Sequence, residues 1–311
     1  MGRFLNDFFK ISKGMGIHNA FRFVWVPRVL NKVGVKKYSQ SQVIDNFISK
    51  EFRDITQKFS NLEISHKDVD NIPKMIWVFW WQGFDSMPNV VKECYNSIIR
   101  NSNGREVVLI TGETYMDYVI IPRYIVNKVS KGIISYTHFS DYLRVALLSK
   151  YGGLWIDAAI FVTKPIQYNN AYFYSPKLSL QQQESPHLHL WVIGVMEAPP
   201  NMPLFSFLLE ILTAYWHRYN EVFSYLMLDY FIRYSYEHFR WFKDIIDTQQ
   251  LNSPDLHSSR YMFDKEVDFA RLEELLANNT FLSLTYRLHY PLQSDNGVET
   301  FYAALIKKYQ D

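Results

Sequence analysis

The sequence predicts an α/β fold in which a mostly parallel sheet is flanked by helices. A strand–helix–strand unit is predicted over residues 75–111, because two apolar runs enclose a segment with helical spacing. A helix starting near residue 137 is followed by two short apolar runs, 154–156 and 160–162, that we expect to be buried strands. Residues 203–247 are rich in aromatics without strand-like alternation, which predicts several packed helices.

Each element of the first unit has its own local signal. Residues 75–80 are apolar enough for a buried strand, and Pro88 suits the first turn of the helix that follows. Asn103 and the next glycine end that helix before a second strand at 107–111. A helix between two strands in this order predicts parallel pairing.

The flanking segments predict further helices and a division of the chain. Residues 43–59 mix polar and apolar residues as helices do, and a polar linker follows them. Pro122 interrupts a helix or loop predicted for 116–131. We therefore divide the chain into an N-terminal helical extension, residues 1–71, and a main domain, residues 72–311.

The composition fits one large water-soluble domain, or one domain with an extension. The chain has 311 residues, of which 48% are hydrophobic and 21% charged, with a formal net charge of +2. The single cysteine, Cys94, excludes an intramolecular disulfide and a cysteine-built zinc site. Glu210 splits the strongest apolar run, so no segment approaches the roughly 20 residues of a membrane-spanning helix.

Positive charge is concentrated at the N-terminus. Residues 1–40 contain eight Lys or Arg and one acid, Asp7, and Phe4, Phe8 and Ile11 within them fall at helical spacing. Basic and aromatic residues on one helix suggest a membrane-surface element. The alternative is a helix that packs on the main domain with a solvated basic face. No nucleic-acid module accompanies the charge, so we expect no nucleic-acid partner.

The helix near residue 137 carries two charged side chains on one face. Ser140 or Thr137 is available as its N-cap, and Gly152 with the next glycine ends it. Asp141 and Arg144 are three residues apart and therefore share a face.

A further acid follows the next predicted strand. Asp157 comes directly after the apolar run 154–156, at the carboxyl end where α/β folds bind ligands. An isolated Asp-x-x-Arg would more simply be a surface ion pair beside a turn aspartate. The glycine pair and the strand that follow favour a ligand site.

This segment resembles a known family. Ser140-Asp141-x-x-Arg144 and Tyr151-Gly152-Gly153-Leu154-Trp155-Ile156-Asp157 resemble the core of glycosyltransferases with a GT-A fold and a sugar-binding "DXD" region. The nearest group is the bacterial capsular polysaccharide synthesis proteins, which are similar to the wider GT32-type family.

A second match lies upstream and in the right order. The stretch 72–83, Ile-Pro-Lys-Met-Ile-Trp-Val-Phe-Trp-Trp-Gln-Gly, resembles the family's first strand, although Trp77 stands where the wider family often has His. The resemblance implies a Rossmann-like GT-A domain with a nucleotide-sugar half, residues 72–165, and a helix-rich acceptor-side half, residues 166–311.

The resemblance also implies roles for the matched residues. Asp141 would accept hydrogen bonds from sugar hydroxyls, Arg144 would donate to the sugar and phosphates, and Asp157 would hold the ribose and a metal. Together these three would form the catalytic group. Three residues at the end of the first strand, Trp80, Trp81 and Gln82, would also bind the nucleotide-sugar. The two tryptophans would stack on the base, or else they simply belong to the core.

One departure from the family pattern weakens the metal prediction. The third position of the Asp-x-Asp motif is Ala159, so a carboxylate that usually ligates the metal is missing. Mg²⁺ or Mn²⁺ could still bind through Asp157, substrate phosphates and water. His289, or else Asp295 or Asn296, is available to complete the site, with no motif in support.

The catalytic base and the acceptor site have weaker signals. His138 is a candidate base, although a histidine at a helix start is more often structural. Residues 185–191 and Asp229 lie where relatives often form the acceptor cleft. His187 and His189 resemble a metal pair superficially, and a half-exposed strand explains them equally well.

Three hypotheses follow. The leading one is a retaining hexosyltransferase that moves a sugar from a nucleotide-sugar, UDP-linked in our expectation, to a lipid-linked oligosaccharide or polysaccharide acceptor during capsule synthesis. It would be cytoplasmic and peripheral at the inner face of the cell membrane, with contact through residues 1–40. The alternatives are a protein-modifying glycosyltransferase and a non-catalytic sugar-nucleotide-binding module, which Ala159 favours.

Overall fold

The computed structural model describes residues 2–32, 40–64, 72–168, 171–178, 190–249 and 252–309. Its centre is a four-stranded sheet with the order β2-β1-β3-β5. β1 (Met75–Phe79) pairs in parallel with β2 (Glu106–Ile110) and β3 (Gly153–Ile156), and β5 (Val195–Ala198) adds an antiparallel edge. The predicted mostly parallel sheet with flanking helices is confirmed.

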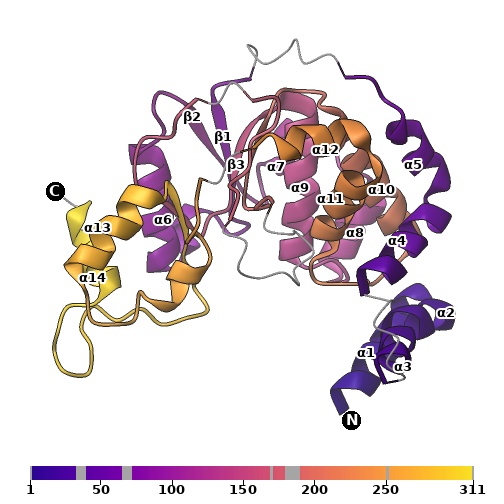
Figure 1. Ribbon diagram of the computed structural model, residues 1–311, viewed down its shortest axis with the longest axis horizontal. Helices are drawn as coiled ribbons and strands as arrows, with labels where there is room; N and C mark the ends of the chain where they lie inside the picture. The colour runs from indigo at the N-terminus through magenta and orange to yellow at the C-terminus, as the bar shows by residue number, and fades with distance from the viewer. Residues whose placement is uncertain are drawn as a thin grey trace.

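Helices cover both faces of this sheet (Figure 1). One face packs on α6 (Asn89–Arg100), with Ile76 and Val78 of β1 in a core shared with that helix. The other face packs on α9 (Tyr136–Tyr151), where Trp77 and Phe79 join a larger core. Successive side chains of a strand point to opposite faces, so β1 alternates between the two cores.

The connections differ in detail from the sequence prediction. A 3-10 turn, η3 (Phe84–Ser86), precedes α6, and the segment around Pro122 divides into α7 (Tyr115–Tyr118) and α8 (Arg123–Ser130). The prediction that Thr137 or Ser140 caps α9 is wrong. Ser135 is the N-cap, and its side chain accepts a hydrogen bond from the His138 amide. Tyr136 and Thr137 already lie within the first turn of the helix, so the N-cap position falls on Ser135.

The glycine pair after α9 is required by close packing. Gly152 has φ 66°, and a Cβ there would lie 2.6 Å from the Ala198 carbonyl oxygen of β5. Its own carbonyl accepts a hydrogen bond from the Trp77 indole at 2.9 Å. These contacts turn the chain sharply from α9 into β3 and fix where β3 begins.

A smaller layer lies beside α6. β4 (Ile160–Val162) pairs antiparallel with β6 (Phe281–Ser283), and α13 (Phe269–Asn278) and α14 (Phe301–Lys308) share a core with them. A short 3-10 turn, η4 (Ser258–Tyr261), precedes α13 in the chain and contacts β6.

The predicted helices of 203–247 are present as three. α10 (Pro203–Arg218) packs on α9, and α11 (Met227–His238) and α12 (Arg240–Asp247) follow it. Most of the aromatic residues in 203–247, on which the helix prediction rested, are buried.

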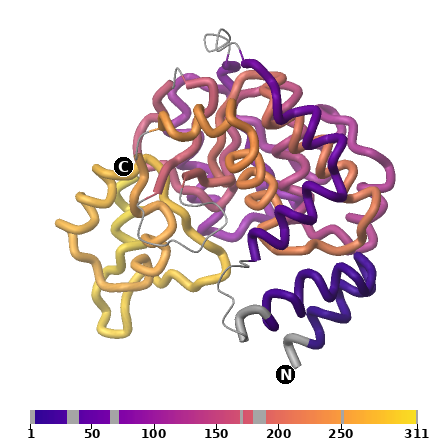
Figure 2. The backbone as a smooth tube through the Cα atoms, turned by 45° about the vertical axis from the view of Figure 1, so that its right-hand side comes forward, coloured from indigo at the N-terminus to yellow at the C-terminus, as the bar shows by residue number. Residues whose placement is uncertain are grey.

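The N-terminal segment is helical. It consists of α1 (Gly2–Met15), α2 (Ile17–Ala20), a π-helical turn η1 (Phe21–Trp25), α3 (Val26–Lys32), α4 (Gln40–Glu51) and α5 (Arg53–Ser60). The single helix predicted over 43–59 is thus two helices, broken at Phe52. Figure 2 shows the segment from α1 to α3, in indigo, as helices lying side by side below the main body.

This segment shares the larger core with the rest of the chain. Ile11, Met15 and Phe23 are buried against it, and Phe23 lies 5.7 Å from the ring of Phe223. The division of the chain at residue 71, and that of the main domain into 72–165 and 166–311, stay predictions. Among the helices described here, none has the length and apolar character needed to cross a bilayer.

Candidate active site

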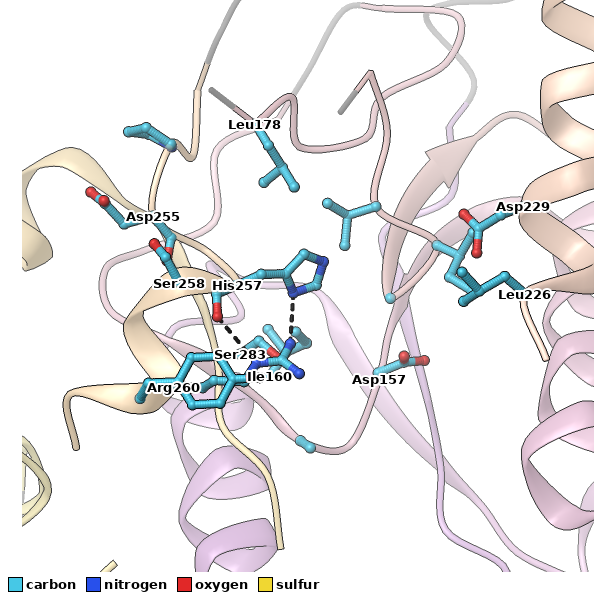
Figure 3. Close-up of a pocket in the computed structure, with 16 residues that line it drawn as sticks. Asp157, Ile160, Leu178, Leu226, Asp229, Asp255, His257, Ser258, Arg260 and Ser283 are labelled. Carbon is cyan, nitrogen blue, oxygen red and sulfur yellow. Dashed lines mark hydrogen bonds between the residues drawn. The ribbon is translucent and has the colours of Figure 1, made fainter. Parts of the chain in front are cut away.

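A cavity of about 560 Å³ opens where β3 ends. One wall comes from the turn after β3 and from the start of α11, and the other from η4 and β6 (Figure 3). Its polar lining consists of Asp157, Asp229, Asp255, His257, Ser258, Arg260, Tyr261 and Ser283. The volume is in the range of sites that hold a small organic ligand.

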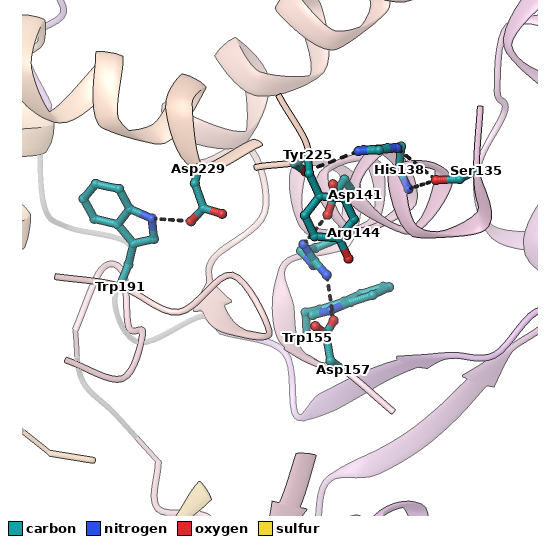
Figure 4. A network of polar contacts seen from close by, with 9 residues as sticks. All are labelled: Ser135, His138, Asp141, Arg144, Trp155, Asp157, Trp191, Tyr225 and Asp229. Carbon is teal, nitrogen blue, oxygen red and sulfur yellow. Dashed lines mark hydrogen bonds and ion pairs between the residues drawn. The ribbon is translucent and has the colours of Figure 1, made fainter. Parts of the chain in front are cut away.

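Asp157 is fixed at the mouth of this cavity. Its Oδ1 accepts hydrogen bonds from the Arg144 guanidinium at 2.6 Å and from the Trp155 indole at 2.7 Å (Figure 4). Its amide donates to the Gly194 carbonyl at 2.8 Å. The side chain keeps 40% of its surface exposed, so Oδ2 can accept from a ligand.

Arg144 is buried behind Asp157 and joins it to Asp141. The Arg144 side chain is 3% exposed, donates to Asp141 Oδ1 at 2.8 Å, and lies 4.9 Å over the Trp155 ring. Burial lowers the pKa of this guanidinium, but Asp157 and Asp141 raise it by more. Burial raises the pKa of the Asp141 carboxyl, and Arg144 opposes that rise.

The structure thus brings the three predicted catalytic residues together, in different positions from those expected. Asp141 and Arg144 are buried and do not line the cavity, which leaves Asp157 as the member in contact with it. In this arrangement, Arg144 positions Asp157. The predicted contacts of Asp141 and Arg144 with a sugar or phosphate stay predictions, and the geometry gives them no support.

Asp229 adds a further carboxylate near Asp141, Arg144 and Asp157. It lies in the first turn of α11, is 3% exposed, and accepts a hydrogen bond from the Trp191 indole at 3.1 Å. Burial raises its pKa to about 7, helped by the charges of Asp141 and Asp157 and opposed by Trp191 and Arg144. The carboxyl therefore changes protonation near neutral pH.

The predicted base-binding tryptophans lie away from this cavity. Trp81 stacks on Tyr136 with 4.5 Å between ring centroids, and Trp80 packs edge-on against Tyr286 at 5.5 Å. Gln82 is exposed in the turn that follows. None of the three lines the cavity, so their role in binding a nucleotide stays a prediction.

His138 has a structural environment. Its Nδ1 is 2.9 Å from the Ser135 hydroxyl, and its Nε2 is 3.3 Å from the Tyr225 carbonyl oxygen. With both ring nitrogens engaged, the histidine ties the start of α9 to the loop before α11. This favours the structural alternative over a catalytic base.

The other candidate ligands are not gathered around Asp157. His289, Asp295 and Asn296 are exposed, and none of them lines the cavity. His187 and His189 lie outside the described residues.

Among the described residues, this cavity also has no group of three side chains that could bind a divalent cation directly. The three-residue group whose side-chain ligand atoms lie within 4.8 Å of one another is Asp45, Glu237 and His238, and none of them lines the cavity. Ala159 offers no ligand, so Mg²⁺ or Mn²⁺ would depend on Asp157 and on substrate phosphates. The metal stays a prediction.

Sequence reasoning missed the second wall and the role of Trp155. His257, Arg260, Tyr261 and Ser283 of that wall were not singled out, and Trp155 was quoted in the motif without a role. Trp155 sits in a recognised strand and could have been noticed from its position two residues before Asp157. The others lie in or directly before a 3-10 turn, or in a short strand, without any motif, so local sequence carried no signal for them.

Fold and site together define an α/β protein with a polar ligand pocket at the carboxyl end of its sheet. The chain belongs to the capsular polysaccharide synthesis protein family, which matches residues 26–305. A stretch of 103 residues is also 27% identical to "O-glycosyltransferase braB" from Annulohypoxylon truncatum, over 30% of this chain and 24% of that protein. The match therefore spans about a quarter of that relative's length.

Proposed function

We propose that this protein is a glycosyltransferase that moves a sugar from a nucleotide-sugar, UDP-linked in our expectation, to a glycan acceptor. The family and the printed name of the relative support a transferase. The observation that carries the proposal is Asp157, whose carboxylate is held by Arg144 and Trp155 at the mouth of a cavity at the carboxyl end of β3.

The proposed reaction exchanges one bond at the anomeric carbon. The bond from that carbon to the diphosphate oxygen breaks, and the electron pair stays on the oxygen. The acceptor hydroxyl oxygen bonds to the carbon, and its proton passes to the departing diphosphate. We propose retention of anomeric configuration, on the family resemblance, and Asp157 would bind donor hydroxyls throughout.

Donor turnover tests this proposal. Purified protein is given UDP-, GDP- and CMP-sugars, with Mn²⁺ or with EDTA, and nucleotide release is measured. We expect one donor to be turned over, and Asp157→Ala to lose the activity. Asp244→Ala, at a position on α12 with a 66% exposed side chain, is the matched control and should behave as wild type. Activity retained in Asp157→Ala would refute the assignment.

The acceptor is proposed to be a lipid-linked oligosaccharide or polysaccharide at the inner face of the cell membrane. The outer face of the first helices supports membrane contact, since Phe9 is 65% exposed, Ile17 62% and Phe21 48%. Lys10 and Lys13 are exposed on the same helix as Phe9. Apolar and basic side chains on neighbouring turns suit an anionic lipid surface.

Vesicle sedimentation tests the membrane contact. Wild type should sediment with vesicles that contain phosphatidylserine, and Phe9→Ser with Ile17→Ser should abolish this. Ile120→Ser is the matched control, because Ile120 is 97% exposed in the main part of the chain. Equal sedimentation of all three proteins would reject the contact and would favour a protein acceptor.

A non-catalytic module that binds the donor is the second candidate. Ala159, which removes a carboxylate from the expected motif, favours it. Donor binding without nucleotide release, in the presence of membrane extract as a source of acceptor, would establish this function instead.

A further inference from the structure

The cavity has several carboxylates and few cations. Asp157, Asp229 and Asp255 all line it, yet a nucleotide-sugar brings two negatively charged phosphates. Among the lining residues that the structure describes, Arg260 and His257 are the basic ones. An anionic ligand in this cavity therefore needs one of them.

Arg144 cannot meet this need in the structure as it stands. Its two terminal nitrogens donate to Asp141 and Asp157, and the side chain is 3% exposed. Its positive charge is already matched by two carboxylates. Freeing it for a phosphate would leave a buried carboxylate without its partner, which is costly.

Arg260 is available and is held in position. Its Nε donates to the His257 carbonyl oxygen at 3.1 Å, and one terminal nitrogen lies 2.8 Å from both His257 Nδ1 and the Ser283 hydroxyl oxygen. In the described parts of the chain, no carboxylate forms an ion pair with it. Figure 3 shows Arg260 and Asp157 on opposite sides of the same cavity.

The position of Arg260 also explains how the site tolerates Ala159. Ser283, which the guanidinium contacts, pairs in register with Ile160, the residue after Ala159. The Leu284 amide donates to the Ala159 carbonyl at 2.9 Å. Arg260 and Ala159 therefore line the same cavity from paired segments, and Ala159 is the position where the family pattern has a metal-binding carboxylate.

We propose that Arg260, oriented by His257 and Ser283, binds the diphosphate of the nucleotide-sugar donor without a bridging divalent metal. The inference rests on the proposed function for the identity of the donor. A guanidinium can donate two parallel hydrogen bonds to phosphate oxygens. As the sugar leaves, Arg260 stabilises the negative charge that collects on the diphosphate.

Binding of inorganic pyrophosphate in EDTA, measured by calorimetry, tests this directly. Pyrophosphate carries the anion without base or sugar, so the result does not depend on the donor's identity. We expect Arg260→Gln to weaken binding about 10- to 100-fold, as for loss of a charged hydrogen bond. Arg260→Lys should retain part of it. Arg240→Gln is the matched control, because that side chain is 94% exposed on α12.

Ala159→Asp gives an independent readout. A carboxylate there would lie near Arg260 and should weaken pyrophosphate binding in EDTA, and added Mn²⁺ should restore it. Binding by wild type that requires Mn²⁺, or that is unchanged in Arg260→Gln, would overturn the inference.

The outcome for the proposed function is separate. Donor turnover by wild type, with no dependence on Arg260, would overturn the inference and leave the transferase intact. Pyrophosphate binding that depends on Arg260, without turnover of any donor, would keep the anion site and reject the transferase.

Discussion

The stability of Asp229→Asn relative to wild type should increase as the pH rises. Asp229 is buried with a pKa of about 7, against an ordinary value of 3.8. Because the pKa is raised in the folded state, folding favours the protonated carboxyl. This stabilisation is fully present below about pH 4 and is lost as the pH rises through about 7. Asn has no proton to lose, keeps an oxygen for the Trp191 indole, and escapes the loss.

The magnitude follows from the pKa difference. From 3.8 to about 7, at 1.36 kcal/mol per unit, the loss amounts to about 4 kcal/mol when complete. Of this, about 2–3 kcal/mol falls between pH 5 and pH 8. Urea unfolding of wild type and Asp229→Asn across this range measures the difference in unfolding free energy, and any constant effect of the amide cancels.

Two further variants show whether the effect belongs to this carboxyl. Asp244→Asn, at an exposed position, should give a difference from wild type that does not depend on pH. Trp191→Phe removes the N–H that stabilises the ionised carboxylate, so the loss of stability should move to higher pH. A flat difference between Asp229→Asn and wild type from pH 5 to pH 8 would refute the reasoning.

Three other substitutions test the frame around the site. Gly194→Ala would put a Cβ 2.9 Å from Asp157 Oδ2 and should lower donor turnover about 10- to 100-fold, and unchanged kinetics would contradict the assigned geometry. Arg105→Met breaks a buried ion pair of 2.7 Å with Glu197 and should cost about 3–5 kcal/mol in urea unfolding, most of which Glu197→Leu in the same chain should restore. Ser135→Ala removes the α9 N-cap and should lower the unfolding free energy by about 1 kcal/mol, with a smaller loss showing that the cap contributes little.

Much of the fold could be predicted because its signals are local. The strand–helix–strand unit 75–111 has apolar runs of strand length, a proline at its helix start and a glycine after the helix. The same holds for α9 and β3, whose boundary is a glycine pair. The error at the N-cap of α9 came from equally suitable hydroxyls at Ser135, Thr137 and Ser140.

The candidate site was predicted in part. Spacing placed Asp141 and Arg144 on one helix face and Asp157 at a strand end, and these three do meet. Spacing could not show that Arg144 would be buried, since its burial depends on contacts with Trp155 and Asp157 in the next strand and turn. Arg260 reaches the cavity through the pairing of β4 with β6, which joins segments more than one hundred residues apart.

The distribution of charge explains how these parts act together. Asp141, Asp157 and Asp229 surround the one guanidinium of Arg144, so full ionisation leaves an excess of negative charge in a buried region. Protonation of Asp229 relieves that excess. The same excess repels a diphosphate from this wall, whereas Arg260 attracts it on the other. We therefore expect the donor to lie with its sugar hydroxyls toward Asp157 and its phosphates toward Arg260, and this polarity orients the anomeric carbon between them.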